Sequence, residues 1–181
     1  MIETLPSALA RAIALMQDLG LRYALIGGGA IIARVRTRAT EDLDLLVSPL
    51  PADIDSMLEA ASRRGYSFDP AERELFDEGL VRLWGPPGRG EGVGLDLIVA
   101  DSPYLAEVIE RATPVDLGSG APSCATLEDL VLLKLEAHRA IDIDDVLAIK
   151  DTFRDALDMD YIRTAASSLG LLDRVALYFD D

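Results

Sequence analysis

Cysteine is nearly missing from this chain of 181 residues, which contains only Cys124. One thiol cannot form an internal disulfide, and residues 1–16 contain no basic run followed by an apolar core, so we expect no secretory signal peptide. Both features predict a protein of the reducing cytoplasm. We interpret Cys124 as a small buried hydrophobic residue, the usual role of a lone thiol.

Long apolar runs and an excess of basic residues are missing as well. No segment approaches the roughly 20 uncharged residues that a membrane-spanning helix needs. The formal net charge is −15, whereas broad binding to nucleic acid requires a clustered basic surface. We therefore expect neither a membrane protein nor a general nucleic-acid binder.

Half of the residues are apolar, which is enough for one domain with a core. The apolar periodicity predicts strands at 23–26, 43–47, 66–68, 80–84 and 95–99, helices at 7–19, 30–35 and 52–64, and a loop at 85–92. From Thr126 onward the pattern is helical. This is typical of an α/β (α+β) fold, which we divide into a core, 1–125, and a helical extension, 126–181, packed on it as a single compact unit.

Asp42 and Asp44 are the first candidate metal ligands. They lie one residue apart in an apolar segment, and residues i and i+2 of a strand project from the same face, while Leu43 and Leu45 face the other way. Burying two ionised carboxylates is costly unless a cation compensates. Mg²⁺, held by one or two carboxylates plus substrate phosphates, is the usual cation.

Asp96 is the third candidate ligand. It is the lone acid of the apolar segment 95–99, where a carboxylate needs a specific reason to be buried. A buried carboxylate on a later strand fits a third position in the same site.

Three consecutive glycines form the run Gly27–Gly29. A dinucleotide-binding fingerprint starting there would need glycine in place of Ile32, and a P-loop would need a Gly-Lys pair, which the chain lacks. Two alternatives are left: a close-packed turn, or a strand-to-helix turn whose backbone N–H groups hold phosphates. We favour phosphate binding because the three aspartates follow in order.

Arg34, Arg36 and Arg38 form the one dense basic cluster, directly before the first two aspartates. A polyphosphate would approach at this point, and guanidinium groups suit phosphate oxygens. Arg34 and Arg36 are equally consistent with a solvated loop or helix end, so Arg38 is the phosphate candidate.

The glycine and aspartate motifs resemble the nucleotidyltransferase superfamily that shares its fold with DNA polymerase β. The matching residues are the pair Gly27 and Gly28, then Asp42-x-Asp44 on a strand, then Asp96 on a later strand. Within the superfamily, the run GGGA followed by RATEDLDLLV resembles the bacterial branch related to abortive-infection toxins of the AbiEii type.

A second match lies in the expected helical region. Lys134, Arg139, Asp142 and Asp145 occupy the positions of the helical motif that this toxin branch carries after its core. The branch usually has a lysine directly before the first acid of that motif, whereas this chain has Ile141. The departure weakens a toxin assignment more than it weakens the superfamily assignment.

The resemblance implies a small mixed sheet with flanking helices and two-metal nucleotidyl transfer, with Mg²⁺ or Mn²⁺ as cofactor and a nucleoside triphosphate (NTP) as substrate. One cation would bind Asp42, Asp44 and the triphosphate. A second would bridge to Asp96 and activate the attacking hydroxyl, whose proton Asp96 could also take.

The resemblance also implies nucleotide-binding residues. Gly27 and Gly28 would hold phosphates, Arg38 would neutralise them, and Thr40 would orient Arg38 or a metal-bound water. Two further residues, Lys134 and Asp145, are assigned to the nucleotide. Lys134 lies in a helix that is apolar on nearly every side, so its ammonium must reach solvent or meet an anion.

The acceptor stays open. A tRNA or other RNA, a protein hydroxyl and a small molecule are candidates, and a toxin would have an antitoxin protein as partner.

The alternative is a nucleotide-binding or interaction module that has lost turnover. Calorimetry with each NTP and Mg²⁺, followed by a radiolabel transfer assay, separates the two, because a module would bind without transfer.

Overall fold

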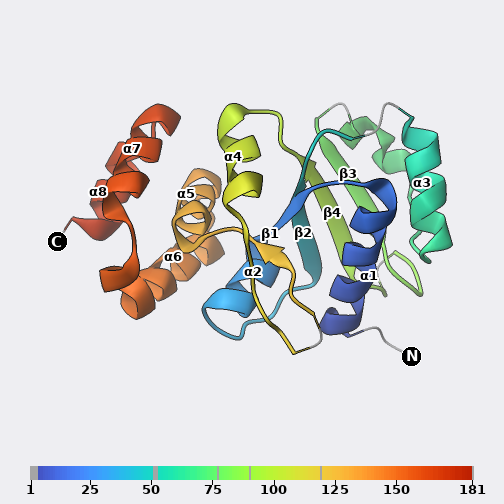
Figure 1. Cartoon of the computed structure of the whole chain (residues 1–181), viewed down its shortest axis with the longest axis horizontal. Helices are drawn as coiled ribbons and strands as arrows, with labels where there is room; N and C mark the ends of the chain where they lie inside the picture. The colour runs from blue at the N-terminus through green and yellow to red at the C-terminus, as the bar shows by residue number, and fades with distance from the viewer. Residues whose placement is uncertain (1–3, 51–52, 77, 90, 119, 181) are drawn as a thin grey trace.

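The computed structural model describes residues 4–50, 53–76, 78–89, 91–118 and 120–180 (Figure 1). Its strands are β1 (Tyr23–Ile26), β2 (Asp42–Val47), β3 (Leu80–Trp84), β4 (Gly94–Val99), β5 (Thr113–Pro114) and β6 (Ser123–Cys124). They form one sheet in the order β3-β4-β2-β1-β6-β5. β2 and β4 are parallel, as are β1 and β6, and the other neighbours are antiparallel, so the sheet is mixed.

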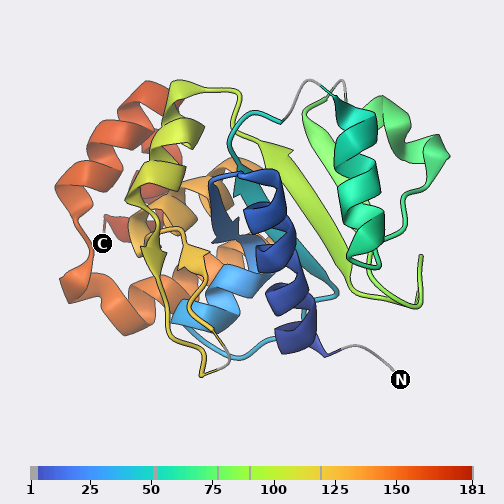
Figure 2. The ribbon, with the colours of Figure 1, turned by 45° about the vertical axis from the view of Figure 1, so that its right-hand side comes forward.

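Helices cover the sheet and make up the C-terminal part of the described chain. They are α1 (Leu5–Leu19), α2 (Gly27–Arg34), α3 (Ile54–Arg63), α4 (Pro103–Arg111), α5 (Leu127–Ala137), α6 (Ala140–Phe153), α7 (Met159–Leu169) and α8 (Leu172–Phe179). Figures 1 and 2 show the strands between α1 and α3 on one side and α5–α8 on the other. Over the described residues, no helix combines the length and apolar character that a membrane crossing requires. The α/β class expected from the sequence, with a mixed sheet and flanking helices, is confirmed.

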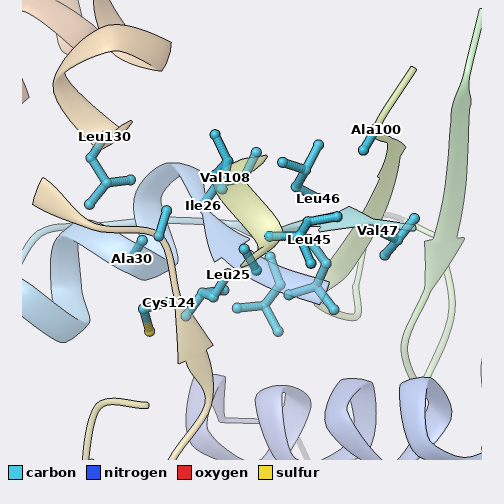
Figure 3. Close-up of a cluster of buried hydrophobic side chains, with 14 of the residues drawn as sticks. Leu25, Ile26, Ala30, Leu45, Leu46, Val47, Ala100, Val108, Cys124 and Leu130 are labelled. Carbon is cyan, nitrogen blue, oxygen red and sulfur yellow. The ribbon is translucent and has the colours of Figure 1, made fainter. Parts of the chain in front are cut away.

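The core is centred on β1 and β2, whose side chains are almost all apolar. Leu25 and Leu45 are buried there, and Leu130 of α5 reaches the same cluster (Figure 3). Cys124 is fully buried in it, as the sequence predicted. Because a helix of the C-terminal region contributes to this cluster, that region packs on the sheet and shares one core with it.

Several expected boundaries are wrong, for local reasons. The helix predicted at 30–35 begins at Gly27, so the glycines form its first turn. The predicted strand 66–68 makes only one bridge, between Ser67 and Trp84. In the helix predicted at 52–64, Ala52 lies outside the described residues, and the helix begins at Ile54. β5 and β6 were not predicted because two residues are too short to show a period.

A buried carboxylate joins α4, α5 and α7. Asp129 is fully buried and accepts hydrogen bonds from Arg111 Nη2 at 2.7 Å and from the Tyr161 hydroxyl at 2.8 Å. The Thr126 hydroxyl donates to it at 3.0 Å, and Arg111 also lies 4.8 Å from the centroid of the Tyr161 ring. The network therefore fixes α4, α5 and α7 relative to one another.

Replacing Asp129 with Ala is expected to lower the free energy of unfolding by about 2–4 kcal/mol, because it leaves Arg111 and the hydroxyls of Tyr104, Thr126 and Tyr161 without their buried acceptor. Urea unfolding, with Asp151→Ala at an exposed position of α6 as the control, measures the difference. Equal unfolding midpoints for the two variants would contradict this role for Asp129.

Candidate active site

A row of charged side chains crosses three neighbouring strands. Arg82 of β3 is paired in register with Asp96 of β4, and Asp96 is paired with Asp44 of β2. Asp42 is paired with Gly94. Residues paired across neighbouring strands project from the same face, so the three predicted carboxylates come together on one face of the sheet.

Glycines make room for two of these carboxylates. Gly27 has φ +57°, and a Cβ built on it would overlap the Asp44 carboxylate. A Cβ on Gly94 would overlap the carboxylate of Asp42. Asp44 therefore leans toward β1 and the start of α2, whereas Asp42 leans toward β4, and any side chain at either glycine would displace an acid.

Crowding raises the pKa values of both acids. Burial is the main cause of the raised pKa of Asp44, and repulsion by Asp96 and Asp42 adds to it. Burial and Asp96 raise the pKa of Asp42 in the same way, while nearby Arg82 opposes the shift. The site thus holds negative charge that the protein alone does not compensate.

Arg82 was missed by the sequence interpretation. Its guanidinium makes two hydrogen bonds to the Asp96 carboxylate. Nε donates to Oδ1 at 2.7 Å, and Nη2 donates to Oδ2 at 2.5 Å. Hydrogen bonding to Asp96 raises the pKa of Arg82, and the charge of Asp42 adds to the rise. The available signal was a lone arginine in the apolar segment 80–84, the same signal that marked Asp96.

Arg38 and Thr40 lie against the glycine turn. A Cβ on Gly28 would overlap Arg38 Nη2 and Thr40 Oγ1. The Thr40 hydroxyl donates to the Asp42 carbonyl at 3.0 Å, which fixes the approach to β2. Within the described part of the chain, Nε and Nη1 of Arg38 are buried and have no hydrogen-bond partner, although Nη1 lies 3.8 Å from Asp145 Oδ2 as a long ion pair. An under-used guanidinium beside the N-terminus of α2 is suited to bind an anion.

The other two arginines of the cluster have structural partners. Arg34 Nη2 donates to the Cys124 carbonyl at 3.0 Å, and Arg36 Nη2 donates to Asp145 Oδ1 at 3.2 Å. Of the three arginines, Arg38 is the one that lies against Gly28 in the glycine turn, and its role in phosphate binding stays a prediction.

Lys134 lies against two carboxylates of the chain itself, and its assignment to the nucleotide stays a prediction. Its ammonium lies 2.8 Å from Asp142 Oδ1 and 3.0 Å from Asp145 Oδ2, and the second contact is an ion pair without hydrogen-bond geometry. Burial opposes ionisation of Asp142, but hydrogen bonds from Arg139 and Lys134 lower its pKa to about 2. Asp145 is fully buried and forms ion pairs with Lys134, Arg36 and, at 3.8 Å, Arg38.

A cavity of about 270 Å³ opens beside Asp44 and Gly27. Its polar wall includes Lys134, Arg139 and Asp142, and its apolar wall includes Leu46, Ile98, Leu105, Leu130 and Leu133. A ligand there would meet charged groups at one end and apolar side chains at the other, the usual make-up of a small-molecule site.

The donor set at this site suits a hard cation held by two carboxylates. Within the described residues, no three side chains of His, Cys, Asp or Glu are grouped so that they could hold one metal ion. Asp42 and Asp44 are only partly compensated by nearby cations, so their pKa values stay raised by burial and repulsion, and Asp96 is bound to Arg82. Because Mg²⁺ commonly takes one or two carboxylates and completes its shell with water and phosphate, Asp42 and Asp44 fit it.

Replacing Asp44 with Asn is expected to raise the thermal midpoint at neutral pH in metal-free buffer, because it removes a buried repulsive charge. A carboxyl with a raised folded pKa costs stability as pH rises from its ordinary value of 3.8 through the folded value. The gain should therefore be full at neutral pH and vanish below about pH 4. Scanning calorimetry across pH, with exposed Asp173→Asn as the control, tests it, and a midpoint lowered at neutral pH would refute it.

Solved structures share this fold at low sequence identity. The structure of ANT(2")-Ia in complex with adenylyl-2"-tobramycin has a TM-score of 0.58 and 15% identity, covering 92% of this chain and 98% of that chain. A solution structure of the antibiotic-resistance factor ANT(2'')-Ia gives 0.58 and 16%, covering 93% and 94%. JHP933 from Helicobacter pylori gives 0.53 and 13%, covering 99% and 80%. These likenesses confirm the expected nucleotidyltransferase fold.

The sequence comparisons identify the family. No curated protein sequence matches the chain significantly. A family model described as nucleotidyltransferase of unknown function, DUF6036, matches residues 5–170. The match spans the glycine turn, the three aspartates and Lys134. The superfamily expected from the sequence is therefore confirmed, and the chain belongs to the DUF6036 family of nucleotidyltransferases.

Proposed function

We propose that this protein transfers a nucleoside monophosphate from an NTP to a hydroxyl group, with Mg²⁺ or Mn²⁺ held by Asp42 and Asp44. One observation carries the proposal: Asp42 and Asp44 share one face of the sheet, and Asp44 lies against Gly27 at the N-terminus of α2, where Nε and Nη1 of Arg38 make no hydrogen bond. This arrangement joins a cation site to a phosphate site. The family description and the shared fold support the same reaction class.

Residues along this face of the sheet would bind the phosphates, the sugar and the base of the nucleotide in turn. The N–H groups of the α2 glycines and the guanidinium of Arg38 bind the β and γ phosphates. The cation, when bound, supplies positive charge for the phosphates and the departing pyrophosphate. The cavity, walled by Lys134 and Arg139, takes the sugar and base.

The bond changes then follow from the substrates. The acceptor oxygen forms a bond to the α phosphorus, and the bond between that phosphorus and the oxygen bridging to the β phosphate breaks. Pyrophosphate leaves with the electron pair, and the hydroxyl proton passes to Asp96 or to water. Asp96 is the carboxylate next to Asp44 in the row, so the acceptor approaches from the β3–β4 side.

A small hydroxylated molecule fits as acceptor better than RNA does. The chain's net charge of −15 opposes attraction of an extended polyanion. The structure of ANT(2")-Ia with adenylyl-2"-tobramycin contains a nucleotidylated small molecule in a protein of this fold. A toxin role with an antitoxin partner rests on the sequence resemblance to AbiEii-type proteins alone, and growth arrest on expression would test it.

Loss of metal-dependent binding in Asp42→Asn and Asp44→Asn is the central expectation. Without one acid, the cation loses half of its protein ligands, so calorimetric binding of each NTP with Mg²⁺ should fall by at least about tenfold. Unchanged affinity in both variants would remove the metal assignment. A wild type that binds but never transfers label to RNA, protein or tobramycin would favour the inactive binding module.

The glycine turn gives a second expectation. Gly28→Ala should weaken NTP binding far more than nucleoside binding, because its Cβ would push Arg38 and Thr40 away from the phosphates. Gly29→Ala, one residue later in the same helix, is the matched control, since its Cβ would meet Leu25 and Leu43 instead. Equal losses for NTP and nucleoside would indicate a merely close-packed turn.

A further inference from the structure

Arg82 binds both oxygens of Asp96, the carboxylate that a second metal ion would use. Resting on the proposed function, we propose that Arg82 is a built-in cation of the active site: it holds Asp96 in place of a second metal, so the complex with nucleotide binds one divalent cation per chain. Arg82 acts through Asp96 and is therefore a positioning residue.

The geometry of the pair is fixed by the backbone. Arg82 and Asp96 are direct partners in the antiparallel pairing of β3 with β4, so their Cβ atoms face one another across the ladder. The two hydrogen bonds, at 2.7 and 2.5 Å, use both carboxylate oxygens. A planar fork binding two oxygens in parallel holds a carboxylate in one orientation, which a single ammonium contact does not do.

Partial burial strengthens this pair relative to a surface ion pair. The Asp96 side chain is 10% exposed and that of Arg82 is 33% exposed. Water screens charges weakly at such a position. A divalent cation bound to the same carboxylate would lie within contact distance of the guanidinium, and the two positive groups would repel strongly. Asp96 can therefore take either Arg82 or a second metal.

The effect of Arg82 extends beyond Asp96. Its charge also opposes the raised pKa of Asp42, so one guanidinium serves two of the three acids. Asp44 and Asp42 lean toward opposite neighbouring strands, over Gly27 and Gly94. The remaining uncompensated charge is that of these two acids, which one divalent cation neutralises.

The test counts metal ions without measuring turnover. Wild type is saturated with the non-hydrolysable α,β-methylene analogue of the NTP that binds best, and radioactive Mn²⁺ retained by the protein is measured by equilibrium dialysis. We expect one ion per chain in wild type and in Asp96→Asn, because Asp96 holds no metal. Two ions in wild type and one in Asp96→Asn would overturn the proposal.

Arg82 variants complete the test. Arg82→Gln leaves Asp96 without its guanidinium partner, so this variant should bind two Mn²⁺ ions per chain. The double variant Arg82→Gln/Asp96→Asn should bind one. Arg82→Lys keeps the charge and should stay at one. A count of one in Arg82→Gln would also overturn the proposal. If that variant does not fold, the comparison of wild type with Asp96→Asn decides alone. A wild type that retains no ion would instead refute the metal site at Asp42 and Asp44, and this inference with it.

Discussion

Mutual repulsion of three carboxylates on one sheet face is the constraint to which the rest of this site responds. Asp42, Asp44 and Asp96 are brought together by the parallel pairing of β2 with β4, and burial makes their charges costly. The protein compensates in part, with Arg82 on Asp96. Asp42 and Asp44 have space, supplied by Gly94 and Gly27, and only partial compensation from Arg82, Lys134 and Arg139, because burial and repulsion still raise their pKa values. A site that stays electrostatically incomplete in the free protein is one that gains stability from a bound cation.

Charge compensation also shapes the opposite wall of the cavity, where it is nearly complete. Lys134, Arg139, Asp142 and Asp145 form a nearly self-neutralised group in which each charge has a partner. Such a wall holds its shape without a ligand and offers a nucleotide fixed polar groups and little net charge. In the proposed function, the attraction for phosphate would come from Arg38 and α2, so binding strength and cavity shape would depend on different elements.

The sequence predicted most of the acidic half of the site and little of the basic half. Two-residue spacing placed Asp42 and Asp44 on one face, and the apolar surroundings of Asp96 marked it as special. Arg82 carried the same local signal, but its meaning depends on the register of β3 against β4, which no short segment encodes. The partners of Lys134 likewise follow from how α5 packs on α6, so the sequence predicted a need for an anion and not which anion would meet it.

The order of the strands along the chain also bears on how the site assembles. β3 and β4 are adjacent in sequence and pair as antiparallel neighbours, whereas β4 joins β2 only after a long parallel crossover. Local pairings close at a smaller entropic cost than distant ones, so the β3–β4 hairpin is expected to form first. Asp96 then reaches Asp44 with Arg82 already attached. The pairing of β4 with β2 then brings a neutral ion pair, and not a bare acid, against the two acids of β2, which lowers the electrostatic cost of that pairing.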